Sequence, residues 1–221
     1  MINLEYSEHT LREVRIVNDA LYELVLERNG LEFIPGDCTA IYTDEGKSRP
    51  YSIASGSYED ELRFVIRKME HGEVSPWLMD RSPGDVIRIT PPFGWFRPGQ
   101  EIDDAPFVFI ATGTGIAPFL SYMHTFDRSP VSCLYGVRQE ADAVGYSLLR
   151  KRCPVQLAVS REKTADHHDG RVTDLLSTLP LDRGIHYYCC GLESMVNDVS
   201  AWLLQHNIEL THIHREVFFH G

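Results

Sequence analysis

The sequence predicts two domains: an antiparallel six-stranded β-barrel, followed by an α/β domain built on a parallel sheet. In the first half, short apolar stretches are separated by Gly, Asp and Pro, as in an antiparallel barrel. In the second half, four apolar strands alternate with helical patterns, which is typical of a doubly wound parallel sheet. The pattern changes at the acidic segment 102–106, so we assign residues 1–101 to the first domain and 106–221 to the second.

Composition narrows the class of protein. The chain has 221 residues, 43% of them hydrophobic, which is enough apolar material for two cores. Its formal net charge of −11 argues against general binding to nucleic acid or anionic lipid. We expect no membrane insertion, because no apolar run is long enough to span a bilayer. The first residues lack the pattern of a signal peptide, so we expect a cytoplasmic protein.

The cysteines do not follow a metal-binding or disulfide pattern. There are five, an odd number, and none has the C-x-x-C spacing. We therefore expect neither a disulfide framework nor a metal site. The five are Cys38, Cys133, Cys153, Cys189 and Cys190.

One predicted barrel strand carries several groups suited to a ligand. The expected strands are residues 12–17, 20–26, 38–42, 49–54, 62–67 and 86–90. In the fourth, Arg49, Pro50, Tyr51 and Ser52 supply a cation, an aromatic ring and a hydroxyl. Arg49 and Tyr51 share one face of the strand, and Ser52 points the other way. Arg49 can pair with a phosphate and Tyr51 can stack on a flat ring; a surface Arg beside a packed Tyr is the alternative.

A second candidate segment lies between the fifth and sixth strands. Gly72, Glu73, Val74 and Ser75 precede Pro76. Ser75 is a favourable N-cap and Pro76 a favourable first helical residue, so a short helix is expected to start here. Its N-terminus offers N–H groups to an anion. The alternative is a capped helix that closes one end of the barrel.

The second domain begins with a strand, a glycine turn and a helix. The apolar strand 107–111 leads into Thr112, Gly113, Thr114 and Gly115, and a helix is expected over 117–126. Such a turn lets the backbone approach a pyrophosphate closely. An ordinary βα turn is the alternative, because a pair of glycines is weakly specific.

The remaining strands lead to the same sheet edge. Gly113, Arg138, Arg161 and Gly191 each follow a predicted strand directly. Ligands of parallel sheets bind beyond the carboxyl ends of the strands, so these residues are expected to converge. The further strands are expected at 131–135, 155–160 and 186–190, and the further helices at 141–151, 172–177 and 194–206.

An ordered set of motifs makes the chain resemble the ferredoxin–NADP reductase superfamily over essentially its whole length. The motifs are Arg-x-Tyr-Ser, Gly-x-x-Ser, Gly-Thr-Gly-Ile-Ala-Pro, Gly-Val-Arg, Ser-Arg-Glu and Cys-Gly-x-x-x-Met. The segment Gly170-Arg171-Val172-Thr173-Asp174 is similar to one in the compact bacterial ferredoxin (flavodoxin)–NADP reductases. The resemblance implies an N-terminal FAD domain and a C-terminal NADP(H) domain.

The resemblance also implies roles in FAD binding. Arg49 would bind the FAD phosphates, Tyr51 would stack on the isoalloxazine, and Ser52 would hydrogen-bond flavin N5. Pro50 belongs to the same motif, and Gly72, Glu73, Val74 and Ser75 would hold the pyrophosphate. In the tail, Glu216 would assist proton delivery, and Phe218 or Phe219 would cover the FAD. The alternative is a terminal edge strand docked on the barrel.

For the nicotinamide nucleotide, the resemblance implies that Thr112, Gly113, Thr114 and Gly115 hold the pyrophosphate. Cys190 would lie beside the nicotinamide, and an ordinary structural thiol is the alternative. Ser160, Arg161 and Arg171 fit a 2′-phosphate and favour NADPH over NADH, unless they form only a solvated loop. Arg138, Gly191 and Met195 are the further nucleotide-binding candidates.

The implied reaction is hydride transfer between NADPH and FAD, with single electrons passing to or from ferredoxin, flavodoxin or another small carrier. Ser52, Cys190 and Glu216 are the catalytic candidates. Docking an acidic carrier needs a basic patch, for which Arg67, Lys68, Arg81 and Arg97 are available. The alternatives are a free-flavin reductase, a reductase component of an oxygenase system, and a regulatory or electron-relay subunit.

Overall fold

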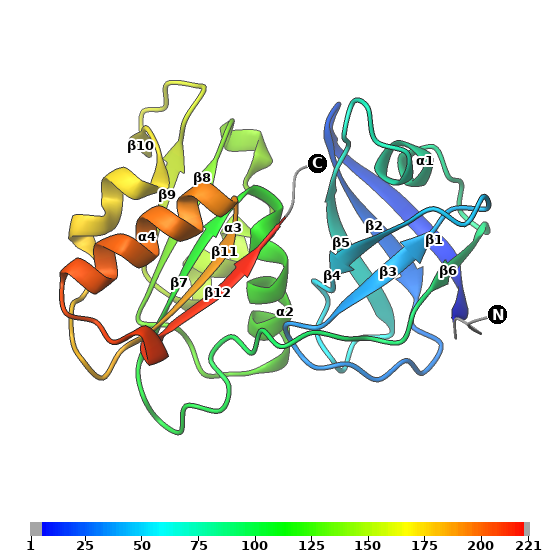
Figure 1. Cartoon of the computed structure of the whole chain (residues 1–221). Coiled ribbons are helices and arrows are strands. Elements are labelled where there is room, and N and C mark those ends of the chain that lie inside the picture. Colours follow the sequence, from blue (N-terminus) through cyan, green and yellow to red (C-terminus); the bar gives the residue numbers. More distant parts are fainter. Residues whose placement is uncertain (1–5, 219–221) are drawn as a thin grey trace.

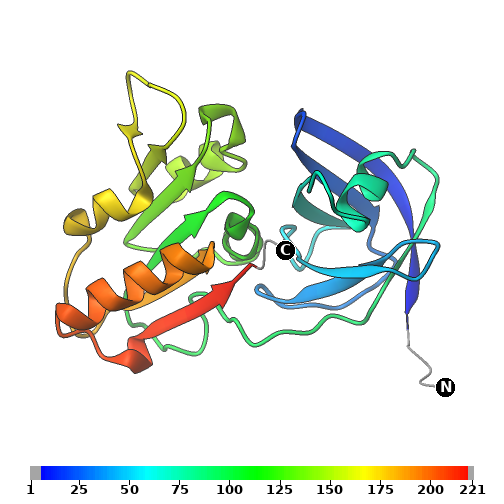
Figure 2. The same cartoon turned by 45° about the horizontal axis from the view of Figure 1, so that its top comes forward.

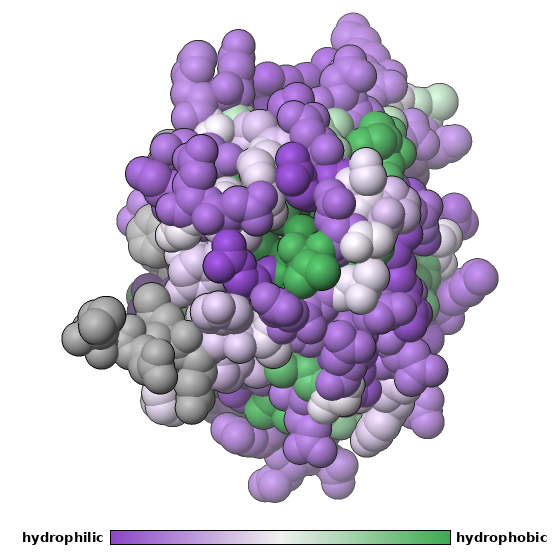
Figure 3. Space-filling view, turned by 90° about the vertical axis from the view of Figure 1, so that its right-hand side faces the viewer, coloured by the Kyte–Doolittle hydropathy of each residue, from purple (hydrophilic) through white to green (hydrophobic). Residues whose placement is uncertain are grey.

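The computed structural model describes residues 6–218 and contains two domains that lie side by side (Figures 1 and 2). The first domain is an antiparallel six-stranded sheet, and the second is a parallel six-stranded sheet covered by helices. The predicted fold class is therefore confirmed. The barrel face turned away from the second domain is mostly hydrophilic, with small apolar patches (Figure 3).

The first sheet curves until its two outer strands meet. Its order is β4-β3-β6-β1-β2-β5, and an isolated bridge joins Ile53 to Phe64 after β4 and within β5. Inward-facing residues such as Leu24 and Phe64 pair across neighbouring strands and are fully buried, which forms the barrel core. The strands are β1 (Ser7–Asn18), β2 (Leu21–Glu27), β3 (Cys38–Tyr42), β4 (Ser48–Ser52), β5 (Glu61–Arg67) and β6 (Val86–Ile89).

The short helix α1 (Val74–Met79) forms where expected but begins earlier. Its N-cap is Glu73, so the prediction that Ser75 caps it is wrong. Ser75 is buried inside the first turn, and its Oγ accepts a hydrogen bond from the Met69 N–H at 3.0 Å. Its carbonyl accepts the hydroxyl of Tyr22 at 2.6 Å. Ser75 therefore ties the helix to the barrel instead of capping it.

The second domain is a three-layer α/β unit. Its strand order is β10-β9-β8-β7-β11-β12, and neighbouring strands run parallel. Cys189 and Cys190 face the two opposite helix layers, as alternation along a strand requires. The strands are β7 (Phe107–Thr112), β8 (Ser132–Val137), β9 (Val155–Val159), β10 (His168–Asp169), β11 (His186–Gly191) and β12 (Ile213–Val217). The α-helices are α2 (Ala117–Thr125), α3 (Tyr146–Arg152) and α4 (Glu193–Gln205).

Several segments of the second domain differ from the sequence prediction. The helix expected over 141–151 begins only at Tyr146, as α3, after the 3₁₀ turn Glu140–Asp142. The helix expected over 172–177 is the 3₁₀ helix η3 (Val172–Thr178). The tail forms β12 beside β11, whereas the predicted alternative was an edge strand docked on the barrel. The other 3₁₀ helices are η1 (Gly113–Ile116), η2 (Glu140–Asp142) and η4 (Leu210–His212).

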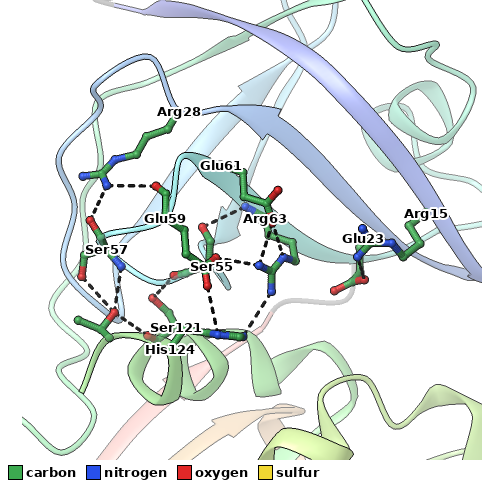
Figure 4. Close-up of polar contacts among 11 residues, drawn as sticks. Arg15, Glu23, Arg28, Ser55, Ser57, Glu59, Glu61, Arg63, Ser121 and His124 are labelled. Carbon is green, nitrogen blue, oxygen red and sulfur yellow. Dashed lines mark hydrogen bonds and ion pairs between the residues drawn. The ribbon is translucent and has the colours of Figure 1, made fainter. Parts of the chain in front are cut away.

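Polar contacts fix one side of the domain boundary (Figure 4). The Ser121 hydroxyl on α2 donates to the Ser55 carbonyl at 2.8 Å, with both residues fully buried. Arg63 pairs with Glu59 at 2.8 Å and Glu61 at 2.9 Å, next to His124 of α2. These contacts join the start of β5 and the segment before it to α2. Within residues 6–218, no helix has both the length and the apolar character to cross a bilayer.

Candidate nucleotide site at the domain boundary

A cavity of about 1210 Å³ lies where β5 meets the carboxyl edge of the second sheet. Both domains contribute to its walls. The barrel supplies Asp19, Ala20, Arg67, Lys68, Met69 and Glu70. The predicted nucleotide-binding residues that line it are Thr112, Gly113, Thr114, Arg138, Ser160, Arg161, Arg171 and Met195. The cavity therefore gathers residues from every loop that the sequence predicted to converge.

The turn after β7 has the geometry of a cradle. Gly113 has φ +53°, and a Cβ there would meet no atom within 4 Å, so its backbone faces open space. A Cβ at Gly115 would lie 2.4 Å from the Cys190 carbonyl oxygen, so only glycine lets this turn touch β11. The backbone can therefore contact a ligand closely on one side while it packs against β11 on the other.

The end of β11 is fixed to the same turn. Gly191 has φ +135°, and a Cβ there would lie 2.3 Å from Thr112 Oγ1. The Leu192 N–H donates to the same Oγ1 at 3.0 Å. Thr112 therefore sets the distance between the two strand ends that border the site.

Arginines and a serine follow β8 and β9 at this edge. The Arg161 N–H donates to the Arg138 carbonyl at 2.9 Å, so the two residues are adjacent. Burial, and then the charges of Arg67 and Arg161, lower the pKa of Arg138. Ser160 donates its hydroxyl proton to the Val137 carbonyl at 3.1 Å, so in this structure its hydroxyl is not free to donate to a 2′-phosphate, contrary to the sequence prediction. This part of the cavity is suited to an anion through its arginines.

Cys190 and Glu216 meet on neighbouring strands. They are in register in β11 and β12, with Cys190 Sγ 3.7 Å from Glu216 Oε2. Burial raises the pKa of Glu216 to about 7, although Cys190 and Arg97 oppose the shift. Burial and the Glu216 carboxylate raise the pKa of the Cys190 thiol. The pair therefore combines a neutral thiol with a carboxyl that titrates near neutral pH.

The barrel wall brings Ser52 toward this pair. Ser52 is in register with Cys38 across β4 and β3, so their side chains share a face. Burial raises the pKa of Cys38 to about 12, and the nearby Glu216 carboxylate adds to the shift. Glu216 is thus close to the strand neighbour of Ser52. Cys190 and Glu216 thus lie near the barrel strand that pairs with the Ser52 strand.

The other predicted FAD residues of the barrel domain lie on β4 and in the segment from Gly72 into the first turn of α1, outside the cavity lining. Arg49 is exposed, and its Nη1 donates to the Ser48 carbonyl at 2.9 Å, which leaves further donors free. Tyr51 packs against the barrel core with its ring half-buried. Gly72 closes a tight turn, in which a Cβ would lie 2.8 Å from the Met69 Cβ. A guanidinium, an aromatic ring and a glycine turn are a donor set that fits a flavin dinucleotide.

Phe218, which follows β12, lies beside the glycine turn of β11. The Phe218 N–H donates to the Gly191 carbonyl at 2.9 Å, and its side chain packs against the core cluster that contains Cys190. Phe219, the other candidate for covering the FAD, lies outside the described residues. Among residues 6–218, no three His, Cys, Asp or Glu side chains are arranged to hold a metal ion.

The expected basic docking patch does not form from the four candidate cations. Arg97 pairs with Asp37 at 2.9 Å, and Arg67 pairs with Asp142 at 3.1 Å. Arg81 lies over the Trp77 ring at 4.6 Å and within 3.9 Å of Asp44 and Asp85. Lys68 lines the nucleotide cavity. Each of the three arginines therefore has a nearby carboxylate that offsets its charge.

Several residues of the site could not be found by sequence reasoning. Arg67 and Asp142 face each other only because the two domains meet, at a sequence separation of 75 residues. Arg97 and Cys38 come close to Glu216 in the same way, from the other domain. None of these four positions belongs to a recognisable motif, so no local signal identified them.

The same division into two domains appears in known protein families. The oxidoreductase FAD-binding domain matches residues 10–97, and the oxidoreductase NAD-binding domain matches residues 109–201. The reductase component of the naphthalene 1,2-dioxygenase/salicylate 5-hydroxylase systems of a Ralstonia species is 30% identical over 204 residues, which cover 86% of this chain and 61% of that protein. A flavodoxin/ferredoxin–NADP reductase of Shigella flexneri is 27% identical, covering 81% of this chain and 82% of the relative.

A solved structure shares the whole fold. The crystal structure of a ferredoxin NADP+ reductase from Neisseria gonorrhoeae with bound FAD and NADP matches with a TM-score of 0.85 at 22% identity. The match covers 97% of this chain and 99% of that one.

Fold and site together define an oxidoreductase with one FAD-binding and one NAD-binding domain. The relatives that this chain resembles include a flavodoxin/ferredoxin–NADP reductase and reductase components of dioxygenase systems. This chain spans about 60% of the length of the dioxygenase-system relatives that it matches.

Proposed function

We propose that this protein is a reductase that transfers hydride between NADPH and bound FAD and exchanges single electrons with a protein carrier. The observation that carries the proposal is the Cys190–Glu216 pair, which borders both the glycine turns of the NAD-binding domain and the wall that carries Ser52. A nicotinamide held by these turns would lie next to a flavin held by the barrel.

The cofactors supply the redox chemistry: a nicotinamide C4 hydride and a flavin N5 that accepts it. The protein supplies position, exclusion of water and a proton. Thr112 contacts Gly191 and Leu192 and so holds the two loop ends together, which would fix the turns that hold a nicotinamide nucleotide. Cys190 is fully buried, so its side chain would present an apolar, water-free surface to a nicotinamide held by these turns. Glu216, with its pKa near 7, can hold or release a proton at neutral pH.

NADPH is favoured over NADH by the arginines on the cavity wall. Arg161 and Arg171 lie on either side of the loop that follows β9, and both line the cavity. The Arg171 backbone N–H is held by Asp174 at 2.7 Å, which fixes the start of η3. Two guanidiniums in this position would pair with a 2′-phosphate.

An absorbance spectrum of the purified protein, before and after anaerobic addition of NADPH or NADH, tests the proposal. The expected result is a bound-flavin spectrum that bleaches faster with NADPH than with NADH. A protein without bound flavin would favour a free-flavin reductase. Bound flavin that neither nucleotide bleaches would favour a relay subunit and contradict the proposal.

A second candidate is the reductase component of an oxygenase system. Names of this kind belong to relatives that are 25–30% identical to this chain. The paired arginines Arg67, Arg81 and Arg97 favour it modestly, because they leave no ready basic patch for an acidic ferredoxin. Reduction of purified ferredoxin or flavodoxin by NADPH and this protein distinguishes the two candidates, since an oxygenase-specific reductase would turn over slowly with these carriers.

A further inference from the structure

We propose that His124 forms a pH-sensitive latch between the two domains, closed while its imidazole is neutral and loosened when the ring is protonated. His124 lies in the last turn of α2, in the NAD-binding domain. Its partners, Glu59 and Arg63, lie just before β5 and at the start of that strand, in the FAD-binding domain (Figure 4). Sequence reasoning assigned no role to any of the three.

Both ring nitrogens of His124 meet a charged side chain of the other domain. Nδ1 lies 3.2 Å from Glu59 Oε1, and Nε2 lies 3.4 Å from Arg63 Nη1. A guanidinium only donates hydrogen bonds, and a carboxylate accepts them. Nδ1 therefore carries the ring proton and donates it to Glu59, while the bare Nε2 accepts from Arg63. This pattern is met by one tautomer of the neutral ring.

Protonation of His124 would remove the acceptor that Arg63 uses. Nε2 would then carry a hydrogen directed at the guanidinium, so that donor faces donor and cation faces cation. Arg63 is also bound to Glu59 at 2.8 Å and to Glu61 at 2.9 Å, so it cannot turn away without breaking these ion pairs. A charged ring would attract Glu59 more strongly, but Glu59 already shares its charge with Arg63.

A second arginine disfavours positive charge at this end of α2. Arg152 of α3 donates to the Met123 carbonyl at 2.8 Å and to the Phe126 carbonyl at 2.6 Å. The carboxyl end of a helix attracts a cation, and here a guanidinium already occupies it. A protonated His124 would therefore add a further cation where one is already present.

The pKa of His124 follows from these surroundings. Burial lowers the pKa below its ordinary value of 6.5. The carboxylates of Glu59 and Glu23 oppose this shift, whereas the guanidiniums of Arg63 and Arg152 add to it. Because the pKa is lower in the folded protein, the latch is intact above about pH 6.5 and is lost as pH falls below that value.

The latch acts on a loop that lies directly against α2. A Cβ at Gly56 would be 2.9 Å from the His124 Cβ, so the two backbones are close. The Ser57 N–H and hydroxyl both lie 3.0 Å from Thr125 Oγ1, and these groups do not change charge with pH. Loss of the latch should therefore loosen residues 55–63 against the end of α2.

The consequence for the reaction rests on the proposed function. If the barrel holds FAD and the second domain holds NADPH, this contact helps to fix how the two rings meet. Loosening it should then slow hydride transfer at acidic pH. The contact itself is measured without any nucleotide, so a failure of the latch and a failure of the proposed function give different results.

Hydrogen–deuterium exchange of the purified protein tests the latch. It is measured from about pH 5 to about pH 8 and corrected for the intrinsic exchange rate at each pH. The variants are H124Q, which stays neutral, and H124K, which stays charged. The matched control is H206Q, which removes a histidine at the end of α4. The thermal midpoint and slow exchange of the buried strand β7 verify that each variant is folded.

In wild type and H206Q, we expect corrected exchange over residues 55–63 and the last turn of α2 to rise about threefold from pH 8 to pH 5. The rise is modest because the His124 side chain is 27% exposed, which screens the repulsion. H124Q should exchange slowly at both ends of the range, and H124K should exchange rapidly at both.

The inference is overturned if the corrected exchange of wild type does not change with pH. It is also overturned if H124Q responds to pH as wild type does, or if H124K exchanges as slowly as H124Q, since the charge of residue 124 would then not control the contact. A nitrogen NMR spectrum that places the proton of the neutral ring on Nε2 would contradict it as well. A latch that responds as expected in a protein whose flavin NADPH does not reduce would overturn only the proposed function.

Discussion

Titratable side chains are buried or half-buried at both ends of the β11–β12 strand pair, and their pKa values shift in opposite directions. At the carboxyl end, Cys190 faces Glu216, and burial raises the pKa of the carboxyl to about 7. At the amino end, His186 Nδ1 lies 2.9 Å from His214 Nε2, and His214 stacks on Tyr188 at 4.2 Å. Burial and the neighbouring histidines lower the pKa of His214 to about 4.

Only one of these ends borders the other domain. Glu216 is near Cys38 and Arg97 of the barrel, whereas the histidines contact each other and Tyr188 within their own sheet. Burial of a titratable group therefore does not by itself indicate chemistry. Position relative to the carboxyl edge of the sheet distinguishes Cys190 and Glu216, the pair that we propose to be functional, from the histidines at the other end.

The largest loss of stability and activity is expected at the carboxyl end of β11, where Gly191 has no space for a side chain. G191V would place a Cβ 2.3 Å from Thr112 Oγ1 at φ +135°, so it should cost at least about 2 kcal/mol and abolish flavin reduction by NADPH. The matched control is G184A near the amino end, where a Cβ would be 3.4 Å from its nearest neighbour. Chemical denaturation and stopped-flow absorbance measure both effects. Normal reduction by G191V would remove this turn from the site.

A smaller effect, on the rate of flavin turnover, is expected when Glu216 is replaced by a residue that cannot transfer a proton. E216Q keeps the shape but cannot exchange a proton, so flavin turnover should slow by about a hundredfold. H214Q, at the other end of the same strand, should turn over within about twofold of wild type. Steady-state reduction of an artificial electron acceptor provides the measurement. Equal losses in the two variants would mean that β12 acts only as scaffold.

Stability should respond to pH with opposite signs at the two ends. The pKa of Glu216 is raised in the folded protein, so its contribution is present below about pH 4.5 and is lost as pH rises toward 7. E216Q should therefore exceed wild type in unfolding free energy at pH 8 by about 2 kcal/mol, with the gap closing at pH 4. Urea denaturation across this range measures the gap. A difference in unfolding free energy that stays the same at every pH would contradict a raised pKa of Glu216 in the folded protein.

The smallest effect is expected at the amino end. Folding lowers the pKa of His214, so stability is lost as pH falls from about 6.5 toward 4, where the unfolded chain binds more protons. Because His214 is only half-buried, H214Q should gain about 1 kcal/mol on wild type between pH 8 and pH 4.5. Urea denaturation of H214Q and wild type across the same pH range measures this difference in unfolding free energy. A shift of the opposite sign would mean that the array is stabilised by protonation.

Local pattern in the sequence accounts for much of this molecule. Strand periodicity and turn residues predict both sheets, and the strand–glycine–helix order at Thr112 to Gly115 predicts the cradle. Residues that follow strands, such as Arg138 and Arg161, were correctly predicted to share an edge. These features depend on neighbours in sequence or on the general geometry of parallel sheets.

What the sequence could not predict depends on contacts between distant segments. Ser75 looks like a helix cap, yet its hydroxyl is used by Met69 because the preceding turn folds back on it. The pairing of Arg67 with Asp142 depends on how the two domains dock. The tail could equally have joined the barrel, and its parallel register with β11 is set by long-range packing.

Rapid mixing of the flavin-loaded protein with NADPH, or with NADPH that carries deuterium at C4, tests the central claim most directly. If hydride passes from the nicotinamide to the flavin at this site, the flavin absorbance falls in a single turnover, and deuterium in the transferred position slows the fall. Flavin that stays oxidised with both forms of NADPH would contradict the account.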